Sequence, residues 1–302
     1  MRLPQVWFLA AALLGPPAFA QLPQTLFFDD FSYADAAGLA TGGWTRRTQP
    51  GHPGVEGARW NDAALRLADD PTTPGNRVLQ LVARTDGTAQ GTEQAQLCHA
   101  RKYLHGTYAA RLRFSDRPAS GADGDPVIQT FYAVSPLRHD FDPEFSELDW
   151  EYLPNGGWGS QATRLYAIAW QTVRIEPWQA HNQDQQVQGS QAGWHTLVIQ
   201  VADGQSRWYV DGRPVARHGG RNHPVVPMAI SFSLWFSPTG LLAPSAQARV
   251  WVQEVDWVLH AANQVLAPEQ VQAEVRRLKQ RGTARVDTVP AAEPPLASRC
   301  DF

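Results

Sequence analysis

Short runs of β-branched and aromatic residues recur along the 302-residue chain, and Gly, Pro, Asp or Asn separates each run from the next. This pattern predicts an all-β sandwich of antiparallel strands. The pairs Asp203-Gly204 and Asp211-Gly212 flank the run SRWYV, so residues 195–216 predict a meander with tight turns. Loops are expected at residues 49–53, 85–94 and 119–125. The expected strands cover residues 77–83, 106–114, 127–134, 146–153, 164–173, 195–201, 206–210, 228–236 and 249–259.

One amphipathic helix is predicted in the run APEQVQAEVRRLKQRG at residues 267–282. Pro268 suits the first helical position, basic residues fill the last turn, and Gly282 can end the helix. We expect this helix to pack against the sandwich, and the Pro- and Ala-rich residues after it to form an extended tail. Three apolar side chains fall on one face of the helix: Val271, Val275 and Leu278.

The first twenty residues predict a cleaved secretory signal, because Arg2 precedes a short apolar run that ends in Pro, Ala and Phe. The alternative, a membrane anchor, needs about 18 apolar residues, and this run is shorter. The mature chain is expected to begin near Gln21, with one domain at residues 21–262 and a helix with a tail at 263–302. A monomer in the periplasm or outside the cell is expected, without membrane attachment.

Charge and cysteine content narrow the possible partners. The formal net charge is −3 and the basic residues form no stripe, so a nucleic-acid partner is not expected. Cys98 and Cys300 are the two cysteines, and an even count in a secreted chain favours a disulfide. Closing a loop of about 200 residues stabilises the fold by at most about 5 kcal/mol in the chain-entropy model. Two separate buried thiols are the alternative.

The run EFSELDWEYLPNGGWG at residues 144–159 holds the candidate chemistry. In a strand, Glu147, Asp149 and Glu151 would lie on one face, and the apolar residues between them on the other. Carboxylates so close repel one another, which favours an open cleft over a purely structural role. Two Glu side chains leaning together can approach the roughly 5 to 5.5 Å that retaining glycoside hydrolysis requires. Solvated carboxylates on an edge strand, or a cation site, are the alternatives.

This sequence resembles glycoside hydrolase family 16, because ELDWE matches the family signature E-[IL]-D-x-E. The resemblance implies a concanavalin A-like β-jelly roll of two antiparallel sheets. It also implies that Glu147 is the nucleophile, Asp149 its helper and Glu151 the general acid/base. Ser233 departs from the Asn usual at that position, which affects the sugar subsites. Further landmarks follow in the family's order: FFDDF at 27–31, YLHGTYAARLRF at 103–114, GWHTLVIQ with RWYVDG at 193–212, SFSLW at 231–235 and VDWV at 255–258.

The expected activity is that of a secreted retaining endo-glycosidase on a β-linked polysaccharide. Among the candidate substrates, β-1,3- or β-1,4-glucan is the leading one. Transglycosylation on the same substrates is an alternative. A lectin or an envelope protein with the same fold is a further alternative, because the fold does not fix the function. The lectin would have no need for two Glu residues at 147 and 151 together.

Sugar rings stack on aromatic faces, and the chain has 12 tryptophans. Trp150, Trp208 and Trp257 are expected in the core. No cofactor is required for the expected reaction, but Asp256 matches a structural calcium ligand of the family, and carboxylate oxygen suits Ca²⁺. Five aromatic residues are candidates for substrate binding: Phe145, Trp158, Tyr166, Trp170 and Trp235.

Overall fold

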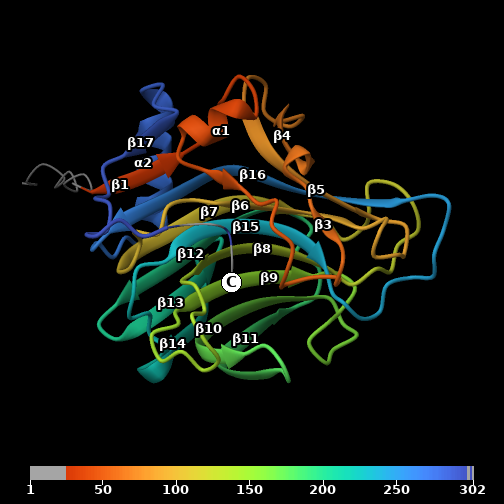
Figure 1. The fold of residues 1–302 in the computed structure, drawn as a ribbon. Helices are drawn as coiled ribbons and strands as arrows, with labels where there is room; N and C mark the ends of the chain where they lie inside the picture. The colour runs from red at the N-terminus through yellow and green to blue at the C-terminus, as the bar shows by residue number, and fades with distance from the viewer. Residues whose placement is uncertain (1–24, 298–299, 301–302) are drawn as a thin grey trace, which may run out of the picture.

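The computed structural model describes residues 25–297 and Cys300, so the predicted signal peptide at 1–20 lies outside the described residues. Two sheets of antiparallel strands pack against each other (Figure 1). One, called here the β9 sheet, has seven strands. In spatial order they are β2 (Thr45–Arg46), β6 (Glu93–Cys98), β15 (Ala229–Phe236), β8 (Val127–Val134), β9 (Glu147–Leu153), β10 (Arg164–Arg174) and β11 (Gln179–Gln188).

The second sheet, called here the β16 sheet, is built around β16 (Arg249–Ala262). One edge of β16 pairs with β7 (Gly106–Phe114), which continues into the meander of β12 (Gly193–Ala202), β13 (Gln205–Val210) and β14 (Arg213–Gly219). The other edge pairs with β5 (Arg77–Thr85) and β1 (Leu26–Asp29). The smaller elements are β3 (Arg59–Trp60), β4 (Leu65–Asp69), β17 (Arg285–Asp287), α1 (Ala37–Thr41), η1 (Asp62–Ala64) and η2 (Gly220–Asn222).

All nine predicted strands are confirmed, and so is the all-β jelly-roll class. The turns of the meander fall where expected, and Asp203, Gly204, Asp211 and Gly212 all have positive φ. The expected loop at 85–94 is wrong at both ends, because β5 ends at Thr85 and β6 begins at Glu93.

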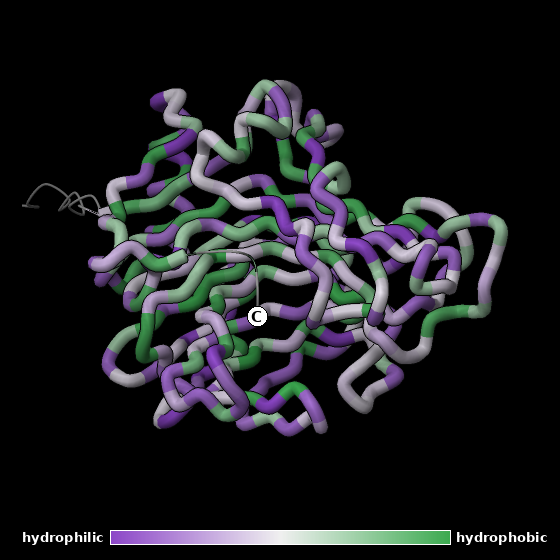
Figure 2. The backbone as a smooth tube through the Cα atoms, viewed as in Figure 1, coloured by the Kyte–Doolittle hydropathy of each residue, from purple (hydrophilic) through white to green (hydrophobic). Residues whose placement is uncertain are grey.

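The hydrophobic core lies between the two sheets. From β9 it receives Leu148, Trp150 and Tyr152, none of which is exposed to solvent. The packing role expected for Trp150, Trp208 and Trp257 is confirmed: the first two are buried between the sheets, and Trp257 is buried under α2. Figure 2 shows the hydrophobic colour concentrated in the central strands and the hydrophilic colour in the outer loops. Because these three side chains of β9 point into the core, its carboxylates lie on the opposite face.

The predicted helix is confirmed as α2 (Pro268–Gln280). Its apolar face of Val271, Val275 and Leu278 packs on Phe28 and Trp257, on the outer side of the β16 sheet. Among the described residues, no helix is long and apolar enough to cross a membrane.

Strand β11 was missed from the sequence. Its residues QAHNQDQQVQ show no alternation of apolar and polar positions, and almost all of them are exposed. The strand forms because it pairs with β10 along its whole length, so backbone hydrogen bonds rather than burial hold it. A polar edge strand of this kind gives no hydrophobic signal.

Candidate active site

Three carboxylates share the outward face of β9, as the alternation in the sequence predicts. Glu147, Asp149 and Glu151 are only 4%, 5% and 9% exposed, although they do not point into the core. Cross-strand pairing places Val134, Tyr132 and Thr130 of β8 on the same face. The structure therefore assembles an acidic site that is covered from above by other side chains.

Burial raises the pKa of all three carboxyl groups, because charged forms lose their solvation. For Glu147, the charges of Asp149 and Glu151 and a hydrogen bond with Asp149 raise the pKa further. The same hydrogen bond lowers the pKa of Asp149, although burial keeps it well above its ordinary range. Burial raises the pKa of Glu151 to about 7, against the lowering effect of a hydrogen bond from Trp158. Glu151 can therefore hold a proton near neutral pH.

Glu147 presents one oxygen without a protein partner. Its Oε2 atom is buried and accepts no hydrogen bond from the residues that the structure describes. An oxygen so placed keeps its lone pairs available for a ligand atom that enters the cleft.

Trp158 lies in the glycine-rich turn that follows β9. Its indole Nε1 donates a hydrogen bond to Glu151 Oε2 at 2.8 Å, while the side chain remains 45% exposed. Its φ of 50° is in the left-handed region, where a bulky residue costs about 1 to 3 kcal/mol. The flanking Gly157 and Gly159 also have positive φ, so the glycines allow the turn to present the indole over Glu151.

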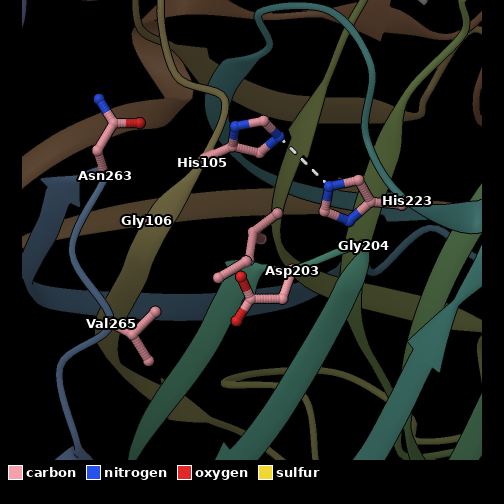
Figure 3. A pocket seen from close by; sticks show the side chains of 9 residues that line it. His105, Gly106, Asp203, Gly204, His223, Asn263 and Val265 are labelled. Carbon is pink, nitrogen blue, oxygen red and sulfur yellow. Dashed lines mark hydrogen bonds between the residues drawn. The ribbon is translucent and has the colours of Figure 1, made fainter.

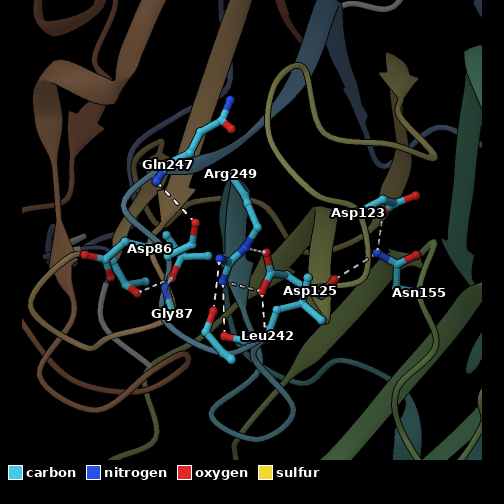
Figure 4. A network of polar contacts seen from close by, with 12 residues as sticks. Asp86, Gly87, Asp123, Asp125, Asn155, Leu242, Gln247 and Arg249 are labelled. Atoms are coloured by element: carbon cyan, nitrogen blue, oxygen red, sulfur yellow. Dashed lines mark hydrogen bonds and ion pairs between the residues drawn. The ribbon is translucent and has the colours of Figure 1, made fainter.

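A buried ion pair supports this turn. Asn155 donates hydrogen bonds to Asp123 Oδ1 at 2.9 Å and to the Asp125 carbonyl at 3.0 Å. Asp125 in turn accepts from Arg249 at 2.5 and 3.0 Å, and both side chains are almost fully buried (Figure 4). The position of Trp158 thus depends on a network that reaches β16.

The other predicted aromatic residues lie on the same side of the β9 sheet. Trp170 is half-buried and donates its Nε1 hydrogen to Asp149. The Trp235 ring is 5% exposed, with its centroid 5.9 Å from that of Trp158. Tyr166 and Phe145 are 3% and 2% exposed, and each belongs to an apolar cluster beside the carboxylates. Of the five, Trp158 offers the largest exposed face for a sugar.

Residues that the sequence did not single out join the loop after β2 to the turn beside Trp170. His52, from the loop after β2, stacks on Trp178 of the β10–β11 turn, with ring centroids 5.7 Å apart. Trp178 also meets Trp170 edge to face at 6.0 Å. On the other side, Trp60 Nε1 donates to the Gly51 carbonyl at 3.2 Å. These contacts join the loop after β2 to the β10–β11 turn, and we call this aromatic bridge the roof. The motif PGHPG gives a loop signal, but its contact with Trp178 is decided only in three dimensions.

The surroundings of Asp256 do not fit a calcium ion. Its Oδ2 accepts from Arg111 Nη1 at 2.7 Å, and its Oδ1 accepts from Lys279 Nζ at 2.7 Å and Asn76 Nδ2 at 3.0 Å. Two cationic side chains already neutralise this carboxylate, whereas Ca²⁺ requires six to eight oxygen ligands. No group of three or more His, Cys, Asp or Glu side chains among the described residues is arranged to hold a metal.

The predicted disulfide is confirmed, since Cys98 and Cys300 are bonded across 202 residues with Cα atoms 5.4 Å apart. A separate pocket lies at the start of β7 and the β12–β13 turn (Figure 3). There, His105 and His223 place their Nε2 atoms 3.3 Å apart. This pocket shares no residue with the acidic face of β9.

Comparison with known proteins agrees with the geometry. The sequence pattern of glycosyl hydrolases family 16 matches residues 63–258. No curated protein sequence matches the chain. The β-glucanase of Bacillus licheniformis has a similar fold, with a TM-score of 0.55 and 15% identity over 79% of this chain and 99% of that one.

Two further solved structures have comparable folds. LamAcat from Zobellia galactanivorans gives a TM-score of 0.56 and 14% identity over 78% of this chain and 97% of its own. A family 16 endo-glucanase from Bacteroides ovatus, in complex with G4G3G-2F-DNP, gives a TM-score of 0.56 and 15% identity over 77% of this chain and 98% of its own.

Proposed function

Because this chain belongs to family 16 of the glycosyl hydrolases, we propose that it is a retaining enzyme that hydrolyses a β-linked glucan outside the cytoplasm. Family membership makes it a glycoside hydrolase; the mechanism, the substrate and the location are the proposal. The disulfide supports an oxidising compartment. The single observation that carries the mechanism is the row of three buried carboxylates on the outward face of β9, under a roof of aromatic rings.

In the first step, the Glu147 carboxylate attacks the anomeric carbon and the glycosidic C–O bond breaks. Glu151 gives its proton to the departing oxygen, which leaves as a hydroxyl. In the second step, Glu151 takes a proton from water, and the water oxygen displaces Glu147 from the same carbon. Two displacements at one carbon restore its original configuration.

Each carboxyl group suits its role. A pKa of about 7 keeps Glu151 protonated for the first step and allows it to accept a proton in the second. Glu147 must be ionised to attack, and its hydrogen bond with Asp149 supplies a neighbour that can take up the proton. Asp149 is itself held by the indole of Trp170. Asp149 therefore adjusts the nucleophile and does not touch the reacting carbon.

The aromatic side chains supply the binding surface for the sugar. Trp158 and Trp235 provide neighbouring rings beside Glu151, and Trp170 covers Asp149. A sugar hydroxyl that occupies the place of water can accept the sugar in the second step. Transfer and hydrolysis then compete, and the ratio of the two products measures this competition.

The test is a reducing-sugar screen of the mature protein on mixed-linkage glucan, β-1,3-glucan, xyloglucan and galactans, followed by NMR of the first product. We expect the β anomer to appear first on a β-glucan. Asp149→Asn should slow hydrolysis less than Glu147→Gln. The α anomer appearing first would exclude the retaining mechanism, and full activity of Glu147→Gln would exclude the assignment of β9.

A further inference from the structure

The disulfide lies on the same face of the β9 sheet as the catalytic carboxylates. Asp149 of β9 pairs with Tyr132 of β8, Tyr132 with Ser231 of β15, and Ser231 with Cys98 of β6. Directly paired residues point to the same side of a sheet. Cys98 therefore stands in one row with Asp149, three strands away, which is about 14 Å at the usual strand spacing.

Cys300 is consequently held above this face. It is 5% exposed, and its carbonyl accepts a hydrogen bond from Gln96 Nε2 at 3.0 Å. The same Gln96 nitrogen donates to Tyr132 Oη at 2.7 Å. Tyr132 is the cross-strand partner of Asp149, so this tyrosine stands beside the row of carboxylates. A short chain of contacts thus links the C-terminal segment to the acidic site.

The chain before Cys300 is anchored at the end of β17. Lys102 Nζ donates to Asp287 Oδ1 at 2.6 Å and to the Val289 carbonyl at 2.8 Å, and Val289 is buried. Residues 290–297 are mostly exposed and lead from this anchor toward the disulfide. The disulfide is therefore the point at which the C-terminal segment is fixed to the cleft side of the sheet.

The opposite end of the cleft, over β11, is lined by exposed polar side chains. Two strands from β9, β11 directs Asn182, Asp184 and Gln186 to the same face, in register with Trp170, Ile168 and Tyr166. All three are exposed, and their amide and carboxylate groups can bond sugar hydroxyls. A sugar chain can extend over β11, whereas over β6 it meets the backbone of Cys300.

We propose that the Cys98–Cys300 disulfide is the end wall of the cleft and determines the length of the product. This inference rests on the proposed function of the β9 carboxylates. Gln96 bonds both the Cys300 carbonyl and Tyr132 Oη, so the wall stands close to the acidic row and leaves room for only a short run of sugar units. The endo cleavage expected from the sequence then becomes cleavage near one end of the chain, with the remaining polymer lying over β11.

The test compares the full-length wild type with Cys98→Ala/Cys300→Ala on end-labelled β-glucan oligosaccharides of increasing length. For the wild type, one of the two fragments should keep the same short length, whatever the substrate length. For the double variant, longer fragments should appear on both sides of the cleaved bond. Glu293→Ala, an exposed change in the same segment, is the matched control and should keep the wild-type pattern.

Binding provides a readout that does not need turnover. In a Glu147→Gln background, affinity should stop rising with oligosaccharide length sooner when the disulfide is present. Removing it should tighten binding of the longest oligosaccharides about tenfold, the effect of one or two added hydrogen bonds. Wild type with dithiothreitol should behave like the double variant, which covers the case in which that variant does not fold.

The outcomes separate the two proposals. Long fragments on both sides of the bond with the wild type, or unchanged fragments and unchanged binding after the disulfide is lost, would overturn the end wall. Absence of hydrolysis together with a disulfide-dependent change in binding length would overturn the proposed reaction and retain the end wall.

Discussion

Trp158→Phe is expected to move the alkaline limb of the pH–rate profile to higher pH. The indole Nε1 donates to Glu151 Oε2 at 2.8 Å, and this bond stabilises the ionised carboxylate. Phe keeps an aromatic face but has no donor. Without the bond, the pKa of Glu151 rises above its value of about 7. Because the proposed general acid, Glu151, must be protonated to act, activity should persist to higher pH.

The size of the shift follows from the hydrogen bond. A bond to a charged group is worth about 1.5 to 3 kcal/mol, and one pKa unit corresponds to 1.36 kcal/mol, which gives about 1 to 2 units. Trp158 is 45% exposed, so water replaces part of the lost bond. We therefore expect a shift of about one unit, the lower end of this range.

The assay is kcat/KM of both proteins between pH 5 and pH 9, because this ratio reports the pKa values of the free enzyme. The ratio of variant to wild type should rise with pH, by about tenfold for a shift of one unit. Trp178→Phe is the control, since this tryptophan is 52% exposed and its ring contacts His52 and Trp170. A ratio that stays flat or falls with pH would refute the role of the indole.

Further outcomes are expected for the catalytic residues, for a buried ion pair and for metal removal. Glu151→Gln should slow hydrolysis by about 10²- to 10⁴-fold, and azide should restore turnover of Glu147→Ala with an inverted product seen by NMR. Arg249→Met should lower the free energy of unfolding by about 3 to 5 kcal/mol in urea, because Asp125 is left buried without its partner; Arg113→Met, at a half-exposed ion pair, should cost less than about 1 kcal/mol. EDTA should leave the thermal midpoint unchanged, because two basic side chains hold the predicted calcium ligand; a clear fall would contradict this.

The sequence alone determined the strands whose residues alternate, because alternation reflects which face is buried. It placed Trp150 in the core and Glu147, Asp149 and Glu151 on the opposite face, and the structure has this arrangement. Helix α2 could also be predicted from the sequence, since its apolar residues follow the helical period. These features depend on local periodicity, which a single chain records directly.

Tertiary structure alone decided the features that join distant segments. Strand β11 has no hydrophobic pattern and exists because β10 offers it an edge. The partners of Asp256 come from β7 and α2, so no local motif could show that Arg111 and Lys279 neutralise it. The cysteine count predicted the disulfide, but only strand register places Cys98 in the row of Asp149. Contacts across a sheet depend on strand order, which the local periodicity of a sequence does not reveal.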